Sequence, residues 1–503
     1  MTLSLERRAA LWGDRVAVVD LSADRRVSYI DLESEADAMA HRLSALGIGP
    51  GDPVAVLSRN RIETLALLFA VRRLGAIFAP VSHRLTPATV ERPLEILDPE
   101  LVVHEAAQRD LVRELPDDQT HSFEDLGRHE GADYRSADRD PDESLVYLHT
   151  KAEADRPAVG EDEGANRPGE SLNEDPTTAT HVVDFPERAV ERNCITAATA
   201  WGLGRGDCAP ALLPLSDADG LLRLTLPLLY VGGRVVLLRA FTPDESLAAV
   251  EAEGATALFG GATEYREVVD SEAFEATDFG SVEWVGTRSA LPADAREELA
   301  RRAPVVRTYG RVETGPNNLC RRAGRSDDPD PFCVGRPFPD CEARIVDDSA
   351  SEDDPTSEDA PVPEGEVGEL QFRGPVTPRG YLTEDGSTDE FPEWVPTGDL
   401  ASREGGDYYL VGATDEALES GSARVHPREV ERALEARAGV TAAGVVPTSE
   451  GVRAAFVGDA DPGELRDVLG DELPDEADLR ELNRMESLPR RPTGKLDRSE
   501  LRQ

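Results

Sequence analysis

Hydrophobic positions in the first hundred residues follow two alternating spacings. Short apolar runs at 16–20, 54–57 and 77–81 have the length and β-branched content of buried strands. Between them, residues 30–46 and 62–74 repeat apolar side chains at helical spacing, and a glycine follows each stretch. Because strands that alternate with helices pair in parallel through crossover connections, this pattern predicts an α/β sheet.

The same alternation resumes in the middle of the chain. A strand is expected at 181–185, a helix with proline in its first turn at 186–201, and a further apolar helix at 221–229. Residues 152–180 and 347–364 are instead rich in Glu, Asp, Gly and Pro, and they predict loops. Such long loops inside a domain are usually functional or disordered.

The C-terminal stretch has its own pattern, with a helix expected over 427–438 between strand-like segments. We therefore predict an α/β fold of two parts. A large N-terminal domain of mixed and parallel sheets would span residues 1–411, with an acidic insertion at about 157–180. A small, mobile α+β domain would span residues 412–503.

The chain is acidic along its whole length, with 99 Asp and Glu residues against 54 Lys and Arg and a formal net charge of −45. Self-repulsion of this size opposes compaction in dilute salt, whereas at molar salt the Debye length falls to about 3 Å and screens it. Acid excess, scarce lysine and few aromatic residues together predict a cytoplasmic protein of a salt-accumulating halophile. No basic patch is visible, so we expect no nucleic-acid partner and no anionic-membrane partner.

The cysteine spacing argues against a cysteine metal site, and the apolar run length argues against a membrane-spanning helix. The five cysteines form no C-x-x-C pair and no metal-binding spacing, which predicts buried side chains or free thiols in a reducing compartment. No apolar run approaches the roughly 18 residues that a membrane-spanning helix needs, and the N-terminus has no apolar signal core. The sequence predicts no particular oligomeric state.

Only two lysines occur among the 503 residues, Lys151 and Lys495. Lysine is normally among the commonest residues, and arginine does not replace it where a compact ammonium must fit between two oxygens. Lys495 stands in the segment Pro-Thr-Gly-Lys-Leu-Asp near the C-terminus. Its retention indicates chemistry, while a leftover surface charge is the alternative interpretation.

Three further segments precede Lys495 in order: TYGRVETG at 308–315, PTGDL at 396–400, and GATDE at 412–416 followed by VHPREVE. Together with VGRP and GEVGEL between the first two, this order resembles the AMP-binding, adenylate-forming superfamily of acyl-CoA synthetases, adenylation domains and luciferases. Within that superfamily the chain looks most like compact CoA ligases of the o-succinylbenzoate–CoA ligase type. The resemblance covers about residue 12 to the end.

The resemblance implies a two-step reaction that uses a small-molecule carboxylate, ATP and CoA, with Mg²⁺ as cofactor. The carboxylate attacks the α-phosphate of ATP to give an acyl-adenylate and pyrophosphate, and the CoA thiol then attacks the acyl-adenylate. Lys495 would bridge the carboxylate and phosphate oxygens, where an ammonium offsets the repulsion of two anions. Asp415 would be the hinge about which the small domain rotates between the two steps.

The same resemblance assigns roles around the nucleotide. Glu313 would hold Mg²⁺ on the phosphates, because this hard cation prefers oxygen ligands. Asp399 would accept hydrogen bonds from the ribose hydroxyls, and Tyr309 and Gly310 would pack along the adenine. With 99 acids in the chain, a single Glu or Asp at these positions is weak evidence, so the case depends on motif order and on Lys495.

The phosphate-binding loop departs most from the family pattern, a Thr-Ser-Gly-Thr-Thr-Gly run followed by Pro and Lys. The matching stretch, 149–158, keeps only Thr150 and Pro157 in place. Its glycines are gone, Glu153 replaces a hydroxyl residue, and Ala158 stands where the loop's lysine is expected. Losing several charge-assisted phosphate hydrogen bonds, each worth about 1.5–3 kcal/mol, would slow the first step by orders of magnitude.

Other departures lie near the adenine, the ribose and the acyl group. The resemblance places the acyl pocket at Asp217, 259–262 and 284–290, where Thr-Arg-Ser-Ala replaces a Gly-Gly-Ala-Pro turn. Asp217 replaces a common histidine, Ala413 replaces an arginine that contacts ribose, and Ser422 replaces a glycine on the pantetheine path.

Three interpretations stay open on the sequence. The first is an active ATP-dependent carboxylate–CoA ligase with a divergent phosphate loop. The second is a catalytically impaired relative that binds a nucleotide or acyl group or acts in assembly. The third is an enzyme that retains only the thioester half-reaction or uses another leaving group. A dinucleotide-binding dehydrogenase is disfavoured, because no G-x-G-x-x-G follows a strand.

Overall fold

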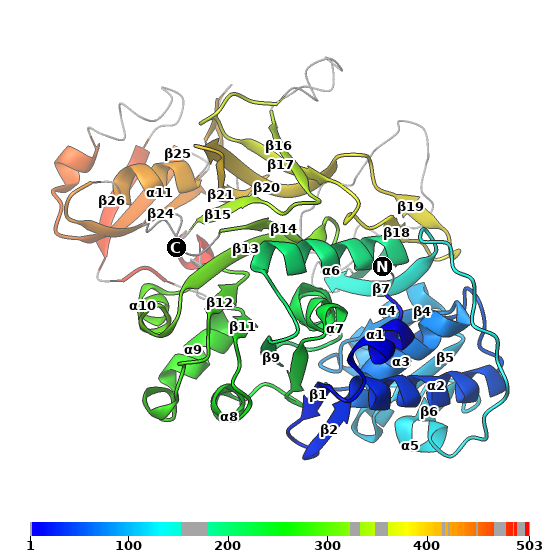
Figure 1. Cartoon of the computed structure of the whole chain (residues 1–503). Helices are drawn as coiled ribbons and strands as arrows, with labels where there is room; N and C mark the ends of the chain where they lie inside the picture. Colours follow the sequence, from blue (N-terminus) through cyan, green and yellow to red (C-terminus); the bar gives the residue numbers. More distant parts are fainter. Residues whose placement is uncertain are drawn as a thin grey trace.

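The structure is a computed structural model with a mixed α/β architecture (Figure 1). It describes residues 3–151, 180–321, 332–347, 361–414, 418–420, 423–425, 427–435, 437–448, 451–466, 479–485, 487–489 and 498–501.

The first sheet is built mainly by the N-terminal 190 residues and has the strand order β19-β18-β8-β7-β4-β3-β5-β6. Its central pairs, β3 with β4 and with β5, and β4 with β7, are parallel as the alternating pattern predicts. The strands are β3 (Pro53–Leu57), β4 (Ile77–Val81), β5 (Leu101–His104), β6 (Thr120–Ser122), β7 (Ser144–Lys151), β8 (Thr180–Pro186), β18 (Gly380–Leu382) and β19 (Thr388–Glu390).

α3 and α4 pack against this sheet, and α2 packs against α3. α2 starts at a reciprocal capping box between Ser28 and Asp31, and α3 is buried nearly all round before it ends at Gly75 in the left-handed conformation. The helical elements of this region are α1 (Leu5–Trp12), α2 (Tyr29–Ala45), α3 (Ile62–Leu74), α4 (Pro87–Leu97), η1 (Ala106–Leu111) and α5 (Phe123–Leu126).

A second, four-stranded sheet has the order β2-β1-β10-β9, in which the antiparallel pair β1 and β2 joins later strands. The apolar stretch predicted as one helix at 221–229 is a π-helix, η2, that continues into the α-helix α7. The elements are β1 (Val16–Asp20), β2 (Arg25–Ser28), α6 (Glu187–Trp201), β9 (Cys208–Ala211), η2 (Asp219–Thr225), α7 (Leu226–Val231), β10 (Arg234–Leu237) and α8 (Pro243–Glu253).

The third sheet has nine strands in the order β11-β12-β13-β14-β15-β21-β20-β17-β16. β11, β12 and β13 are parallel, and the other pairs are antiparallel. The elements are β11 (Ala257–Gly260), α9 (Ala262–Asp270), η3 (Phe274–Ala276), β12 (Trp284–Thr287), α10 (Ala293–Arg302), β13 (Val305–Arg311), β14 (Gly315–Cys320), β15 (Cys333–Pro337), β16 (Glu342–Val346), β17 (Gly368–Arg373), β20 (Val395–Glu404) and β21 (Asp407–Ala413).

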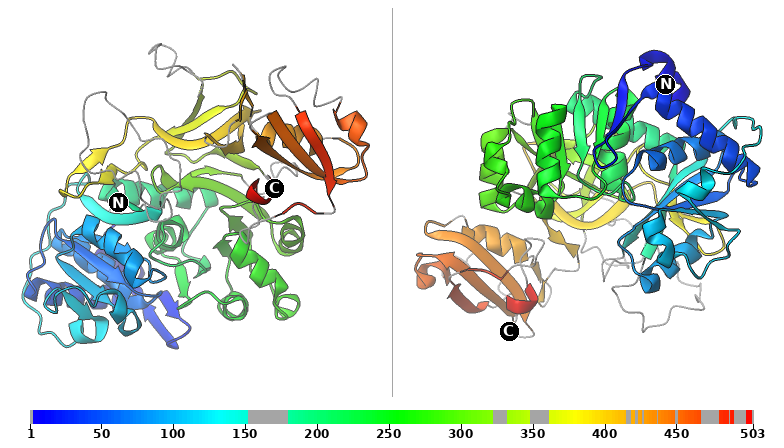
Figure 2. Two further views of the ribbon diagram at one scale, coloured as in Figure 1. Left: turned by 180° about the vertical axis from the view of Figure 1, so that it is seen from behind. Right: turned by 90° about the horizontal axis from the view of Figure 1, so that it is seen from below.

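The C-terminal unit has its own small core, formed by one face of α11 and a three-stranded sheet, β24-β25-β26. Figures 1 and 2 show this unit, coloured orange to red, beside the third sheet and away from the N-terminal strands in blue. α11 ends three residues before the predicted boundary. The elements are β22 (Leu418–Ser420), β23 (Ala423–Val425), α11 (Pro427–Glu435), β24 (Val440–Thr448), β25 (Gly451–Gly458), β26 (Leu479–Met485) and α13 (Arg498–Leu501).

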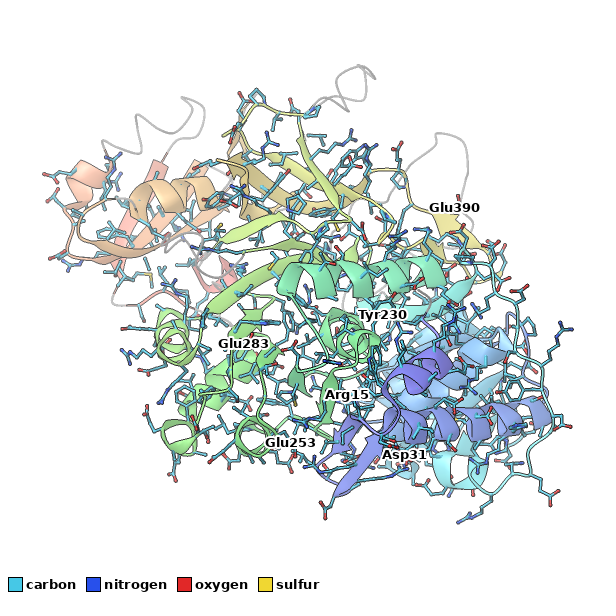
Figure 3. The ribbon with its side chains drawn as sticks, viewed as in Figure 1. Arg15, Asp31, Tyr230, Glu253, Glu283 and Glu390 are labelled. Carbon is cyan, nitrogen blue, oxygen red and sulfur yellow. The ribbon has the colours of Figure 1, made fainter. Side chains whose placement is uncertain are left out.

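Charged and sulfur-bearing side chains are distributed as their chemistry requires. Exposed carboxylates occur on well-separated parts of the surface, among them Asp31, Glu283 and Glu390 (Figure 3). All five cysteines are buried, one of the two states that their spacing predicted. Among the described residues, no helix combines the length and apolar character that crossing a bilayer requires.

Candidate active site

Tyr309 and Asp399, predicted to contact the nucleotide, are joined directly in the structure. Tyr309 lies on β13 and Asp399 on β20, and the Tyr309 hydroxyl donates to Asp399 Oδ2 at 2.5 Å. Burial, and then the neighbouring Asp399 carboxylate, raise the pKa of Tyr309 well above its ordinary value. Tyr309 therefore stays protonated, donates to the carboxylate and stacks on Phe372 with ring centroids 5.9 Å apart.

An arginine completes this contact and extends it toward the predicted metal ligand. Arg311 Nη1 donates to the same Asp399 Oδ2 at 2.8 Å, and its Nε lies 3.9 Å from Oε2 of Glu313. The Tyr381 hydroxyl donates to Oε1 of Glu313 at 3.3 Å. The Glu313 side chain is buried, and Arg311 and Tyr381 are among the protein groups that compensate its charge.

The strand that leads into the predicted phosphate loop reaches the same cluster. Thr150 is half-buried near the end of β7 and pairs with His181 on β8. The His181 and Tyr381 rings lie 4.7 Å apart, and Tyr381 in turn contacts Glu313. The structure therefore connects Thr150 to Glu313 through two aromatic side chains.

Gly310 is required by the backbone of the β13–β14 hairpin. A Cβ at this position would lie 2.0 Å from the carbonyl oxygen of Pro316, so no larger residue fits without moving the hairpin. The Gly310 carbonyl also accepts a hydrogen bond from Arg223 Nη2 at 3.4 Å. Packing of Gly310 along an adenine stays a prediction.

A network of charges that runs from the buried Arg223 to the exposed Arg288 lies behind Gly310, at the predicted acyl pocket. Arg223 is 1% exposed and binds Asp219 Oδ1 at 2.5 Å and Thr308 Oγ1 at 3.1 Å. Arg288 Nη1 binds Asp219 Oδ2 at 2.7 Å and lies 3.7 Å from Asp217 Oδ2. Asp219 thus bridges two arginines.

The pKa values of the two aspartates in this network are shifted in opposite directions. Burial favours the neutral acid at both, but the Arg223 and Arg288 guanidinium groups outweigh it at Asp219 and lower the pKa there. At Asp217 burial is reinforced by the negative charge of Asp219, and the pKa is raised. Asp219 is therefore the permanent anion of the cluster, and Asp217 is the acid that takes up a proton more readily.

The predicted acyl-pocket segments do converge on this network. The Arg223 guanidinium lies over the Phe259 ring, 5.0 Å from its centroid. A small pocket between η2, β9 and β11 is lined mostly by apolar side chains, together with Asp219 and Thr225. Arg288 Nε would lie 3.3 Å from a Cβ on Gly261, so that glycine leaves room for the guanidinium.

Sequence reasoning assigned no role to Arg223, Asp219 or Arg311. A charged residue four positions after an acid, inside an otherwise apolar run at 221–229, was the available indication for the first two. Arg311 belongs to the quoted TYGRVETG segment, but its partner Asp399 is 88 residues away. Local patterns do not reveal such a pair.

Several predicted site residues cannot be placed in this geometry. Lys495, Asp415, Ser422 and the loop residues 152–158 lie outside the described residues. Ala413 is described, and it pairs with Asp399 across β20 and β21. The domain boundary and the roles of these residues stay predictions.

A magnesium site would have to be built largely by the nucleotide. Within the described part of the chain, no group of three or more His, Cys, Asp or Glu side chains is placed to bind a metal. Mg²⁺ usually keeps several waters and takes one or two carboxylates together with substrate phosphates. The single buried carboxylate of Glu313 fits that arrangement.

The family follows from comparison with known proteins. The model of the family described as "AMP-binding enzyme" matches residues 5–175 and 187–382, well over half of the chain. The chain belongs to the AMP-binding enzyme family. The resemblance deduced from motif order is thereby confirmed.

Several curated relatives of this AMP-binding enzyme are CoA ligases and synthetases. It is 31% identical to a 2-hydroxy-7-methoxy-5-methyl-1-naphthoate–CoA ligase of Streptomyces carzinostaticus, over 95% of this chain and 88% of that protein. It is 27% identical to a feruloyl-CoA synthase of an Amycolatopsis species (84% and 80% covered) and 24% identical to a 2-succinylbenzoate–CoA ligase of Bacillus cytotoxicus (99% and 98%). The predicted enzyme class, an AMP-forming acid–thiol ligase, is the class of these relatives.

Solved structures confirm the predicted fold class. Apo MatB from Rhodopseudomonas palustris aligns over 100% of this chain and 98% of its own, with a TM-score of 0.78 and 23% identity. The amide bond synthetase McbA from Marinactinospora thermotolerans aligns over 99% of both chains, with a TM-score of 0.77 and 25% identity.

Proposed function

We propose that this AMP-binding enzyme is an ATP-dependent carboxylate–CoA ligase that forms an acyl-adenylate and then an acyl-CoA thioester. The observation that carries the proposal is the contact between Tyr309, Arg311 and Asp399, with Glu313 beside it, in a chain that has several CoA ligases among its curated relatives. It brings the three predicted nucleotide residues of two separate motifs into one place.

The charged residues of the site have separate proposed roles. Asp399, oriented by the Tyr309 hydroxyl, accepts hydrogen bonds from the ribose hydroxyls, and Glu313 would hold Mg²⁺, which neutralises phosphate charge. Lys495 brings an ammonium between the attacking carboxylate and the α-phosphate and stabilises the charge that develops there. Rotation about Asp415 then exchanges Lys495 for the CoA thiol.

The acyl group would enter near Asp217, Arg288 and the pocket under η2. Because this region combines the charged side chains of Asp217 and Arg288 with a pocket lined mostly by apolar side chains, we expect a compact carboxylate rather than a long chain. The acid excess supports a cytoplasm rich in salt as the working environment, since screening relieves the net charge of −45.

A catalytically impaired relative is the second candidate. Its support is the rewritten phosphate loop, in which Glu153 and Ala158 replace residues that would bind phosphate. A carboxylate within about 5 Å of a triphosphate would oppose its binding by several kcal/mol at an intermediate dielectric. Such a protein would bind a nucleotide or an acyl group without adenylating it.

Pyrophosphate release separates these candidates. The protein is incubated in multimolar KCl with ATP, Mg²⁺, CoA and a panel of carboxylates, beside Lys495→Ala. Arg484→Ala, which removes an exposed cation from the same C-terminal unit, is the control. A ligase releases pyrophosphate only with a carboxylate, and Lys495→Ala lowers the rate by at least about 100-fold while Arg484→Ala does not.

Two results would contradict the ligase. Nucleotide binding by calorimetry without any pyrophosphate release supports the impaired relative. Transfer of an acyl group to CoA from a synthetic acyl-adenylate, without pyrophosphate chemistry, supports an enzyme that retains only the thioester half-reaction.

A further inference from the structure

Arg311 connects the two acids of the candidate nucleotide site. Its Nη1 binds Asp399 Oδ2 at 2.8 Å, and its Nε lies 3.9 Å from Glu313 Oε2. The side chain is 16% exposed and therefore partly accessible to solvent. The cation therefore lies between the proposed ribose-binding carboxylate and the proposed metal-binding carboxylate.

We propose that Arg311 binds the phosphate of the nucleotide and supplies charge that the altered phosphate loop no longer provides. This inference rests on the proposed function. Between ribose and metal ligand, the part of a nucleotide that must pass is its phosphate, since the phosphates join the sugar to the metal. Arg311 thus lies on the path that the proposed roles of Asp399 and Glu313 define.

The charge balance of the site favours a further cation beside the phosphates. Asp399, Glu313 and a nucleotide phosphate are all anions, and Ala158 stands where the family pattern has a lysine. A guanidinium has five N–H donors in a planar fork, so one arginine can hold the Asp399 carboxylate and a phosphate oxygen together. Arginine is also weakly hydrated and stays charged, which suits a partly buried phosphate contact.

The competing explanation is that Arg311 only neutralises the two carboxylates and fixes their positions. The two roles differ in how they depend on the charge of the ligand. A phosphate-binding Arg311 strengthens AMP and ATP binding and leaves the neutral nucleoside adenosine unaffected. A purely positioning Arg311 affects adenosine as much as AMP, because both carry the ribose that Asp399 would bind.

Calorimetric titration of the full chain in multimolar KCl with adenosine, AMP and ATP tests the inference. AMP is titrated without added metal, so that Glu313 contributes no bound cation. The variants are Arg311→Met, which keeps the length without the charge, and Arg311→Lys, which keeps the charge. Arg336→Met is the matched control, because Arg336 makes a similar 2.8 Å ion pair with Asp407 at the surface of the same sheet.

We expect Arg311→Met to weaken AMP and ATP binding by about 10- to 100-fold, the effect of one charge-assisted hydrogen bond, and to change adenosine binding by less than about twofold. Arg311→Lys recovers part of the loss, and Arg336→Met binds all three ligands like the wild type. The inference is overturned if Arg311→Met binds AMP normally, or if adenosine and AMP weaken equally. If the wild type binds none of the three ligands, the proposed function fails together with it, whereas normal ATP binding by Arg311→Met removes this inference alone.

Discussion

Replacing Glu105 with Gln removes a buried carboxylate that joins two sheets. Glu105 follows β5 and accepts a hydrogen bond at 2.6 Å from Nη2 of Arg59, which follows β3. The same oxygen, Oε1, also accepts from Arg239, which follows β10 in the second sheet. The Glu105 side chain is 5% exposed, whereas Arg59 and Arg239 are 34% and 32% exposed, so solvent reaches only the cationic side of this ion pair.

The magnitude follows from the pKa of Glu105. Burial favours the neutral acid, but the hydrogen bonds from Arg59 and Arg239 outweigh it and lower the pKa from 4.5 to about 2. That difference corresponds to about 3 kcal/mol of folding free energy. Because the folded pKa lies below the unfolded one, the contribution is complete above about pH 5 and is lost as the pH falls toward about 2.

The measurement is urea unfolding in multimolar KCl, followed by tryptophan fluorescence, for wild type and Glu105→Gln across this pH range. The stability difference should be largest near neutral pH and shrink steadily as Glu105 becomes protonated in the wild type. Glu342→Gln is the control, because Glu342 is 63% exposed in its 2.8 Å pair with Arg373 and should change stability by less than about 1 kcal/mol. A difference that is equal at both ends of the pH range, or a control that loses as much stability, would refute the reasoning.

Three further outcomes are expected. Gly310→Ala should abolish AMP binding measured by calorimetry, because its Cβ would lie 2.0 Å from a backbone oxygen, whereas Gly206→Ala, with open space around it, should bind normally. Asp219→Ala should lower the free energy of unfolding in urea by about 3–5 kcal/mol, because it removes the main counter-charge of the fully buried Arg223, and exposed Asp270→Ala should change it little. Transfer from multimolar KCl to dilute buffer should unfold the protein, as monitored by circular dichroism, because the net charge of −45 is no longer screened; a cooperative, unchanged melt at low salt would contradict this.

The elements predicted from sequence are those with strong local patterns. The strand Val16–Asp20 and the helix Ile62–Leu74 were predicted at these bounds, since apolar runs and a terminal glycine are local features. The stretch 221–229 was predicted helical, but spacing alone did not distinguish the π-helix that precedes α7. Arg223, in this π-helix, is buried and donates a hydrogen bond to Thr308, 85 residues away, a contact that local spacing does not reveal.

In the candidate site, too, local motifs were predicted from the sequence and long-range contacts were not. Motif order predicts that Tyr309, Glu313 and Asp399 contact a nucleotide; the structure joins Tyr309 to Asp399, and the nucleotide roles stay predictions. The motif did not reveal that Arg311 binds Asp399. A side-chain contact between β13 and β20 depends on how the three strands that lie between them are ordered in the sheet. Sequence patterns identify types of residues, whereas partners require the assembled sheet.

The edge of the first sheet has a consequence for synthesis of the chain. β8 ends at Pro186, yet the strand that covers it, β18, begins at Gly380, and Arg379 supplies the counter-charge for Asp184, which is fully buried. Until the ribosome has released residue 390 or so, β8 has an unpaired edge and Asp184 has no arginine. The nascent chain therefore carries an open, aggregation-prone strand through about two hundred residues of translation, and the N-terminal sheet is completed only after most of the third sheet has been made.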